Sequence, residues 1–261
     1  KEPCTASIVP PSLECQISSL GSLNEKWLEG EFSISCTSNI SKLKQQKQKE
    51  SMKRKEGGRG SGGVRIYWPS VSFVKGSIDG YSAGGSLCLG TKNLKPPVLQ
   101  RMRKYETPPY LPHRHNITPH IKTMTKVVDK EICELGWVYT GSHNLSLAAW
   151  GNLVKKETSL MIRHYEIGIL FLPSLFSPTP TTFLPGLPPP LSPSPSLPPS
   201  FPSPTSSSSS STHQTISFPL SFSFPPRPFE FEEENGGDVP WVWDRSYNYP
   251  DNYGRYWPAR E

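Results

Sequence analysis

A run of fifty residues without one charged side chain, Ser177 to Pro226, limits what this chain can fold into. Seventeen of the thirty prolines lie between Pro173 and Pro228, and residues 206–211 are six consecutive serines. Proline has no N–H to donate to a helix or sheet, so we predict a disordered, polyproline-like Pro/Ser-rich insertion over 177–226. A proline-rich ligand for a partner domain and translated non-coding sequence are the alternatives for this segment. The 211 residues outside it (261 − 50) suffice for a sizeable core.

The net charge is concentrated in one run. Lys42 to Arg59 holds eight Lys/Arg and two Glu, which equals the formal net charge of +6 of the whole chain, so the remainder is neutral. Such a run is typical of a solvated loop, here predicted over 38–63, and a nucleic-acid contact is the alternative.

The cysteines and the apolar runs exclude several classes of protein. The cysteines are odd in number and widely spaced, with no CxxC pair, so we expect no disulfide framework and no metal site. No apolar run reaches transmembrane length and no signal peptide is recognisable, so we expect an intracellular protein without a membrane partner. The five cysteines are Cys4, Cys15, Cys36, Cys88 and Cys133.

Strand and helix patterns alternate along the chain, which predicts an α/β fold. Asn24 is a predicted helix N-cap before a four-residue apolar spacing. Around Glu166, the run 160–172 becomes apolar on both faces, as in a central strand, which carries this carboxylate into the interior. The expected strands are 8–22, 64–68 and 160–172, and the expected helices are 24–32, 71–78 and 94–107.

Two neighbouring segments hold groups that suit phosphate chemistry. His120 and Lys122 are two apart in an extended stretch, so their side chains share one face. Gly141-Ser142-His-Asn144 follows a predicted strand and precedes a predicted helix, where free N–H groups attract anions. Phosphodiester cleavage needs a nucleophile, an acid for the leaving oxygen, and cations or donors on the other oxygens. These segments supply the acid and the cations or donors, but not the nucleophile.

At these residues the sequence resembles the second half of tyrosyl-DNA phosphodiesterases, in the phospholipase D superfamily. The similar segments are HIKT, GSHNLSLAAWG and MIRHYEIGILFLPS, with support from 18–28, 67–87 and 240–258. In most of the superfamily four residues separate the motif lysine from an Asp. In this chain residues 123–126 are those four and Val127 follows, so the Asp is absent, which fits the tyrosyl-DNA phosphodiesterase form.

The resemblance implies a role for each motif residue. His120 matches the acid/base histidine, Lys122 and Asn144 match phosphate-holding residues, and Glu166 matches a carboxylate that orients a histidine. No metal or other cofactor is implied. The expected substrate contacts are Ser142, Ser146, Ser86 and Trp257.

The implied enzyme is a nuclear DNA-repair phosphodiesterase. It acts on single- or double-stranded DNA whose 3′ end is blocked by a topoisomerase I peptide, through a phosphohistidine intermediate. The implied fold is one half of a two-half, phospholipase D-like α/β fold, a mixed sheet flanked by helices. We expect residues 1–176 to form the half domain and 227–261 to pack back on it as an aromatic segment.

The chain departs from the family in one respect. The family's nucleophile lies in a first His-x-Lys motif, whereas this sequence contains only the pair at His120. We therefore expect little activity from the chain alone, and an exposed face that favours self-association. A non-catalytic nucleic-acid-binding or interaction protein is the alternative, and an inactive gene product is a third hypothesis.

Overall fold

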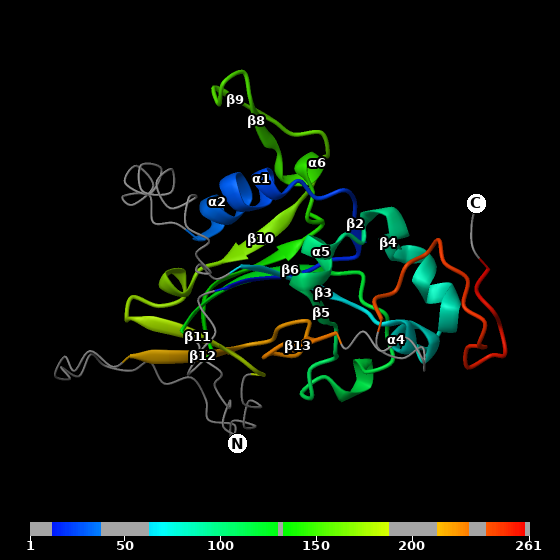
Figure 1. The fold of residues 1–261 in the computed structure, drawn as a ribbon. Helices are drawn as coiled ribbons and strands as arrows, with labels where there is room; N and C mark the ends of the chain where they lie inside the picture. The colour runs from blue at the N-terminus through cyan, green and yellow to red at the C-terminus, as the bar shows by residue number, and fades with distance from the viewer. Residues whose placement is uncertain (1–11, 38–62, 130–132, 188–212, 230–238, 259–261) are drawn as a thin grey trace, which may run out of the picture.

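The structure is a computed structural model, and it describes residues 12–37, 63–129, 133–187, 213–229 and 239–258 (Figure 1). Its centre is a nine-stranded sheet in the order β12-β11-β7-β6-β1-β3-β5-β13, with β10 paired to β7 outside this path. The sheet is mixed, because β1 runs parallel to β3 and antiparallel to β6. The predicted α/β fold, a mixed sheet flanked by helices, is confirmed.

The strands of this sheet are β1 (Ser12–Gln16), β3 (Val64–Trp68), β5 (Met102–Lys104), β6 (Lys122–Asp129), β7 (Glu134–Gly141), β10 (Gly168–Phe171), β11 (Thr181–Pro185), β12 (Gln214–Phe218) and β13 (Arg227–Pro228). Two small sheets pair β2 (Ser19–Leu20) with β4 (Cys88–Leu89) and β8 (Asn152–Val154) with β9 (Ser159–Met161). The α-helices are α1 (Glu25–Trp27), α2 (Ser33–Thr37), α4 (Val71–Lys75), α5 (Pro96–Arg101) and α6 (Leu147–Trp150). A short π-helix, η1 (Leu28–Phe32), joins α1 to α2, and the 3₁₀ helices are η2 (Gly80–Ser86), η3 (Thr91–Asn93), η4 (Pro112–Arg114) and η5 (Pro173–Leu175).

The helical run after β2 begins at the predicted residue. The Asn24 Oδ1 accepts hydrogen bonds from the backbone N–H groups of Lys26 at 2.9 Å and Trp27 at 3.3 Å, which confirms the N-cap. The π-helical turn η1 then places Trp27 and Phe32, five residues apart, together, and their rings stack 5.2 Å apart. Burial of each such ring stabilises the fold by about 1.5–3 kcal/mol, so this pair fixes α1, η1 and α2 against the sheet.

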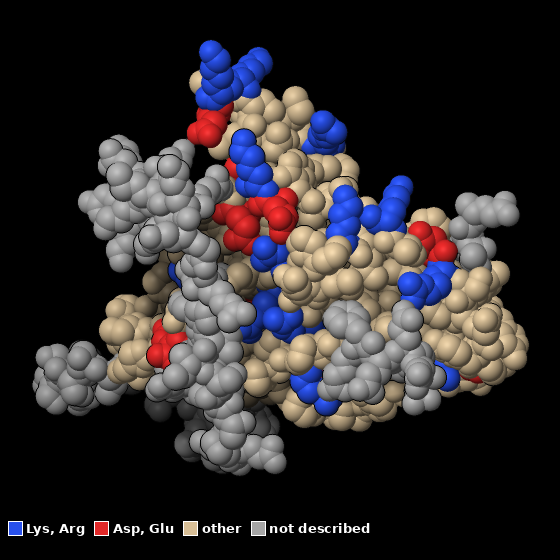
Figure 2. All heavy atoms as spheres, viewed as in Figure 1, with Lys and Arg blue, Asp and Glu red and all other residues tan. Residues whose placement is uncertain are grey.

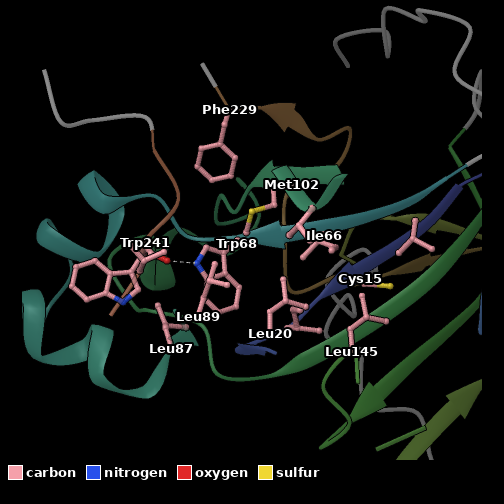
Figure 3. Close-up of a cluster of buried hydrophobic side chains, with 14 of the residues drawn as sticks. Cys15, Leu20, Ile66, Trp68, Leu87, Leu89, Met102, Leu145, Phe229 and Trp241 are labelled. Carbon is pink, nitrogen blue, oxygen red and sulfur yellow. Dashed lines mark hydrogen bonds between the residues drawn. The ribbon is translucent and has the colours of Figure 1, made fainter. Parts of the chain in front are cut away.

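The main core lies on one face of the sheet and includes the C-terminal aromatic segment (Figure 3). The Trp68 indole N–H donates to the carbonyl of Trp241 at 2.8 Å, and both rings are fully buried. Residues 173 positions apart therefore share one core, to which the described residues 239–258 contribute.

The predicted helix over 94–107 is only partly correct. Pro96 and Pro97 occupy the first turn of α5, where their missing N–H groups cost nothing. The helix ends at Arg101, and Met102–Lys104 becomes β5, which pairs in parallel with β3. Pairing with β3 therefore stabilises Met102–Lys104 as a strand more than the local spacing of apolar residues stabilises it as a helix.

The predicted central strand over 160–172 is wrong in its extent and place. Leu160 and Met161 belong to β9 in a separate small sheet, and only Gly168–Phe171 joins the large sheet, where among the described residues its one partner is β7. Ile169 and Leu170 are 60% and 52% exposed. Apolar residues on both faces therefore mark a surface at the margin of the sheet and not its centre.

The insertion differs from the predicted disorder in its two end regions. Residues Thr181–Pro185 and Gln214–Phe218 form the parallel strands β11 and β12. Phe183 and Phe222 are fully buried, because they pack with apolar side chains on one face of the sheet. Residues 188–212, like residues 38–62 of the predicted basic loop, lie outside the described residues.

Candidate functional site

The His-x-Lys pair lies where the chain enters β6. Lys122, the first residue of that strand, is 6% exposed, and its Nζ donates to the carbonyl of His120 at 2.7 Å. The same Nζ lies 3.5 Å from the His120 Nδ1, while the imidazole itself is exposed in front of the strand. The side chains of His120 and Lys122 therefore lie on the same side of the chain, as predicted, although His120 precedes the strand.

Burial and neighbouring charges shift the pKa values of both residues of this pair. Partial burial lowers the pKa of His120, and the neighbouring Lys122 ammonium lowers it further. Burial also lowers the pKa of Lys122, whereas the nearby Glu166 and Cys88 oppose that change. His120 is therefore biased toward the neutral imidazole that can accept a proton, and Lys122 lies beside the carboxylate of Glu166.

Asn144 is oriented by a distant turn. Its Oδ1 accepts hydrogen bonds from the backbone N–H groups of Ser18 at 3.1 Å and Ser19 at 3.0 Å. Because the carbonyl oxygen is occupied by two donors, the amide presents its NH₂ group for other contacts. An NH₂ donor suits a phosphate oxygen. Sequence reasoning could not reveal these partners, which lie more than 120 residues away.

Two glycines bring the Gly-Ser turn against the chain that carries Glu166. Gly141 at the end of β7 is opposite Gly168 in β10. A Cβ at Gly141 would lie 2.5 Å from the Ile167 carbonyl oxygen and 2.6 Å from the Gly168 Cα. The absence of side chains at both positions permits this approach.

Ser142 joins the same two segments. Its N–H donates to the Ile167 carbonyl at 2.9 Å, and its Oγ accepts from the Ile167 N–H at 2.9 Å. The hydroxyl expected to contact substrate is thus engaged with backbone, and it holds the segment that positions Glu166.

Glu166 faces two histidines that the sequence analysis did not single out. Its Oε1 lies 3.6 Å from the Nδ1 of His164, and it lines a cavity of about 410 Å³ with His143. The His143 Nδ1 contacts the Tyr139 hydroxyl, and its ring lies 4.3 Å from the Trp150 ring. Burial lowers the pKa of His143, and Glu166 opposes this shift. The position of His143 inside the Gly-Ser-x-Asn segment was the available signal.

Three further predicted contacts have structural partners. The Ser146 Oγ caps α6 by accepting from the Ala149 N–H at 3.2 Å. The Ser86 hydroxyl donates to the Ala83 carbonyl at 2.9 Å, on an exposed part of η2. Trp257 is buried against the main core. These bonds account for local structure, and substrate contact at these residues stays a prediction.

The described part of the chain contains no cluster of three or more His, Cys, Asp or Glu side chains arranged to hold a metal. None of its helices is long and apolar enough to cross a membrane. Cys15, Cys36 and Cys88 are free thiols.

The family model for tyrosyl-DNA phosphodiesterase matches residues 2–230. The chain is 36% identical over 265 residues to the tyrosyl-DNA phosphodiesterase 1 of Arabidopsis thaliana, covering 93% of this chain and 38% of that protein. It is 30% identical over 167 residues to the Drosophila melanogaster protein of the same name, covering 61% and 26%. The chain thus spans well under half the length of these relatives.

The fold is similar to a crystal structure of the yeast tyrosyl-DNA phosphodiesterase, with a TM-score of 0.49 and 18% sequence identity. This match covers 90% of the present chain and 50% of the yeast chain.

Proposed function

The chain belongs to the tyrosyl-DNA phosphodiesterase family of phosphodiester hydrolases, and on that premise we propose that it supplies the acid/base half of a centre that cleaves 3′-phosphotyrosyl bonds. The observation that carries this proposal is the pairing of Lys122 in β6 with Gly141 in β7. It sets the exposed imidazole of His120 and the buried ammonium of Lys122 beside the turn that holds the oriented amide of Asn144.

Each group has a distinct part in the proposed reaction. Lys122 and the Asn144 NH₂ hold non-bridging phosphate oxygens and offset their charge. A nucleophilic histidine from a first His-x-Lys motif attacks phosphorus, and His120 donates a proton to the leaving tyrosine oxygen. His120 then removes a proton from water, which hydrolyses the phosphohistidine. Glu166 orients the imidazole of a histidine beside it, His143 or His164, near the same phosphate.

This chain contains one His-x-Lys pair, so we propose that it does not turn over alone. Purified chain should release no tyrosine from a 3′-phosphotyrosyl oligonucleotide. Adding a polypeptide with the first His-x-Lys motif should restore release, and a His120→Ala chain should fail to do so. Tyrosine release by the chain alone that depends on His120 would refute the half-site proposal.

Binding tests the phosphate-holding role without requiring turnover. Lys122→Met should reduce the preference for a 3′-phosphotyrosyl over a 3′-hydroxyl oligonucleotide by about tenfold, measured by fluorescence anisotropy. Lys126→Met is the matched control, because Lys126 lies on the same strand and donates to the Thr37 carbonyl. Equal effects of the two substitutions would contradict the assignment.

The substrate we propose is DNA with a topoisomerase I peptide at its 3′ end, and the setting is DNA repair in the nucleus. Imaging of the tagged chain in cells tests the location, and a cytoplasmic signal would contradict it.

A non-catalytic nucleic-acid-binding protein is the second hypothesis, favoured by the single His-x-Lys pair. Lys and Arg are interspersed with Asp and Glu on the face in Figure 2, in keeping with a neutral chain outside Lys42–Arg59. This hypothesis predicts salt-sensitive single-stranded DNA affinity that is lost when Lys42–Arg59 is deleted.

A further inference from the structure

A small cavity of about 280 Å³ lies between the start of η2 and the C-terminal segment. The segment, red in Figure 1, runs beside the chain between α4 and β4. The volume is just below the range of about 300–1,000 Å³ typical of small-molecule sites, so the cavity suits one planar ring system. Its lining residues are distinct from the groups proposed to handle phosphate, and they are Asp79, Ser82, Ala83, Tyr253 and Arg255.

Hydrogen bonds join the two walls, so the cavity is preformed. The Asp251 carboxylate accepts from the backbone N–H groups of Tyr81 in η2 at 3.0 Å and of Tyr253 at 2.9 Å. The Tyr253 hydroxyl donates to the Ile78 carbonyl. Gly80 has a φ of +56°, and a Cβ there would lie 2.2 Å from the Asp251 Oδ2, so the absence of a side chain permits this approach. Walls fixed in this way require little ordering when a ligand binds.

The wall from the C-terminal segment presents a flat face. Tyr253 is 62% exposed, and the guanidinium carbon of Arg255 lies 4.6 Å from the centroid of the Tyr253 ring. Hydrogen bonds to the Asp251 carboxylate and to the Asp79 carbonyl hold this guanidinium in place. An exposed aromatic ring beside a fixed guanidinium is a surface on which nucleobases stack.

The opposite wall presents hydrogen-bonding groups. Asp79 and Ser82 are three residues apart at the start of η2, where side chains with this spacing lie above one another. Both residues are exposed, and both line the cavity. An ionised carboxylate accepts hydrogen bonds through two oxygens, and a serine hydroxyl donates one. This wall therefore suits a ligand edge on which two adjacent donors stand next to an acceptor.

The charges around the cavity limit the class of ligand. A phosphate would meet the carboxylate of Asp79, and a second cation on the Tyr253 ring would meet the Arg255 guanidinium. A neutral planar ring avoids both repulsions. Guanine is the DNA base with two adjacent donors, N1–H and N2–H₂, beside an acceptor, O6.

We propose that this cavity binds one unpaired guanine base of a DNA strand, an inference that rests on the proposed function in taking DNA as the partner. The ring stacks on Tyr253, N1–H and N2–H₂ donate to Asp79, and O6 accepts from Ser82. The base must be unpaired, because a cytosine partner would occupy the same edge. The seven residues of η2 end at Ser86, a distance of about 14 Å at about 2 Å per residue. The guanine therefore lies within about four nucleotides of the DNA that Ser86 contacts, at about 3.4 Å per nucleotide.

Nucleoside binding to the full chain, followed by NMR titration, tests the site directly. Adenosine, which lacks both N1–H and the 2-amino group, should bind about tenfold more weakly than guanosine. Inosine, which lacks only the 2-amino group, should lie between them. Asp79→Asn should remove the preference for guanosine over adenosine, and Tyr253→Leu should weaken the binding of both by about tenfold. Asp79→Asn keeps the shape of the exposed side chain, which covers the case in which Tyr253→Leu disturbs its turn.

Two substitutions on the same segment are matched controls. Tyr256→Leu changes a tyrosine that is also 62% exposed, and Asp244→Asn changes an aspartate that binds Thr91. Neither residue lines the cavity, so guanosine binding should not change.

A second measurement places the base in a DNA strand. In fluorescence anisotropy, a single-stranded oligothymidylate with one dG should bind about tenfold more tightly than the strand without it. Asp79→Asn, or a complementary strand that pairs the dG, should remove this gain. Equal affinity for the two strands, with guanosine still bound, would overturn the assignment to DNA and leave a site for a free nucleoside.

The outcomes separate this inference from the function on which it rests. Equal binding of guanosine and adenosine by the unmodified chain would overturn the guanine site, as would unchanged guanosine binding in both Asp79→Asn and Tyr253→Leu. Tighter binding of argininamide than of guanosine would overturn it too, because the cavity would then accept a cation. Failure of the 3′-phosphotyrosyl experiments would instead refute the phosphodiesterase half-site, and the guanosine result would still report on the cavity.

Discussion

Replacing Asp251 by Asn should destabilise the protein at neutral pH and remove a pH dependence of its stability. The Asp251 carboxylate is fully buried and accepts from the backbone N–H groups of Tyr81 at 3.0 Å, Tyr253 at 2.9 Å and Arg255 at 2.9 Å. The guanidinium of Arg255 donates to it at 2.9 Å and 2.8 Å. These bonds join the C-terminal segment to η2, the turn that carries Ser86.

The magnitude follows from the pKa of this carboxyl. Burial alone would raise that pKa, but the backbone and side-chain hydrogen bonds from Arg255, Tyr253 and Tyr81 outweigh it and lower the pKa from 3.8 to about 2. One unit of pKa corresponds to about 1.4 kcal/mol, so the charged form stabilises the fold by about 2 kcal/mol. Arg255 is 45% exposed, so solvent screening places the expected value toward 1.5 kcal/mol.

The direction of the pKa shift determines how the stabilisation by Asp251 changes with pH. Because the folded pKa lies below the unfolded one, this stabilisation is fully present above about pH 4 and is lost as the pH falls through 2. Urea unfolding followed by tryptophan fluorescence should therefore show a gap of about 1.5 kcal/mol between wild type and Asp251→Asn at pH 6. The gap should nearly close at pH 2.

A gap that keeps the same size from pH 6 to pH 2 would refute this reasoning, since the loss would then come from packing and not from the charge. Asp244→Asn is the matched control. Asp244 accepts from the Thr91 N–H and hydroxyl and has no guanidinium partner among the described contacts. Its substitution should leave the acid slope between pH 4 and pH 2 in place.

Three further predictions concern the site and the surface beside it. Lys122→Met should raise the pKa of His120, because one of the two causes that lower it is removed, and an NMR titration of the imidazole measures this shift. Gly141→Ala should lower the free energy of unfolding by about 2 kcal/mol, seen in urea unfolding, since its Cβ would lie 2.5 Å from the Ile167 carbonyl oxygen. Ile169→Lys should reduce concentration-dependent self-association in sedimentation velocity, because the 60% exposed side chain belongs to the apolar surface of β10.

Each of these predictions has a matched control. Lys126→Met should leave the pKa of the His120 imidazole unchanged. Gly21→Ala should be close to neutral, because a Cβ at Gly21 has no atom within 4 Å. Ile78→Lys changes an equally exposed isoleucine outside β10 and should not alter association. An effect of a control as large as that of its paired substitution would contradict the corresponding explanation.

The sequence by itself determined the features that depend on a few neighbouring residues. Asn24 predicted the helix start, because an N-cap depends on N–H groups two and three residues away. The alternation of His120 and Lys122 predicted that they would meet, since their separation is only two residues. The family follows from motifs of this length.

Only the tertiary structure decided which partners those residues have. The Asn144 amide is oriented by Ser18 and Ser19, and the Ser142 hydroxyl is engaged by the backbone of Ile167. These contacts depend on how β1, β7 and β10 are arranged in the sheet, which no local spacing encodes. The structure also showed two histidines near Glu166, where the sequence suggested a buried carboxylate in a central strand.

The insertion gives the clearest physical reason for the difference. Its composition predicted disorder, because proline and serine bury little surface in isolation. Phe183 and Phe222 are nevertheless buried, since the sheet offers them an apolar face that they cannot make for themselves. Composition reports what a segment can do alone, and the fold of residues 177–187 and 213–226 depends on the surface that the rest of the chain provides.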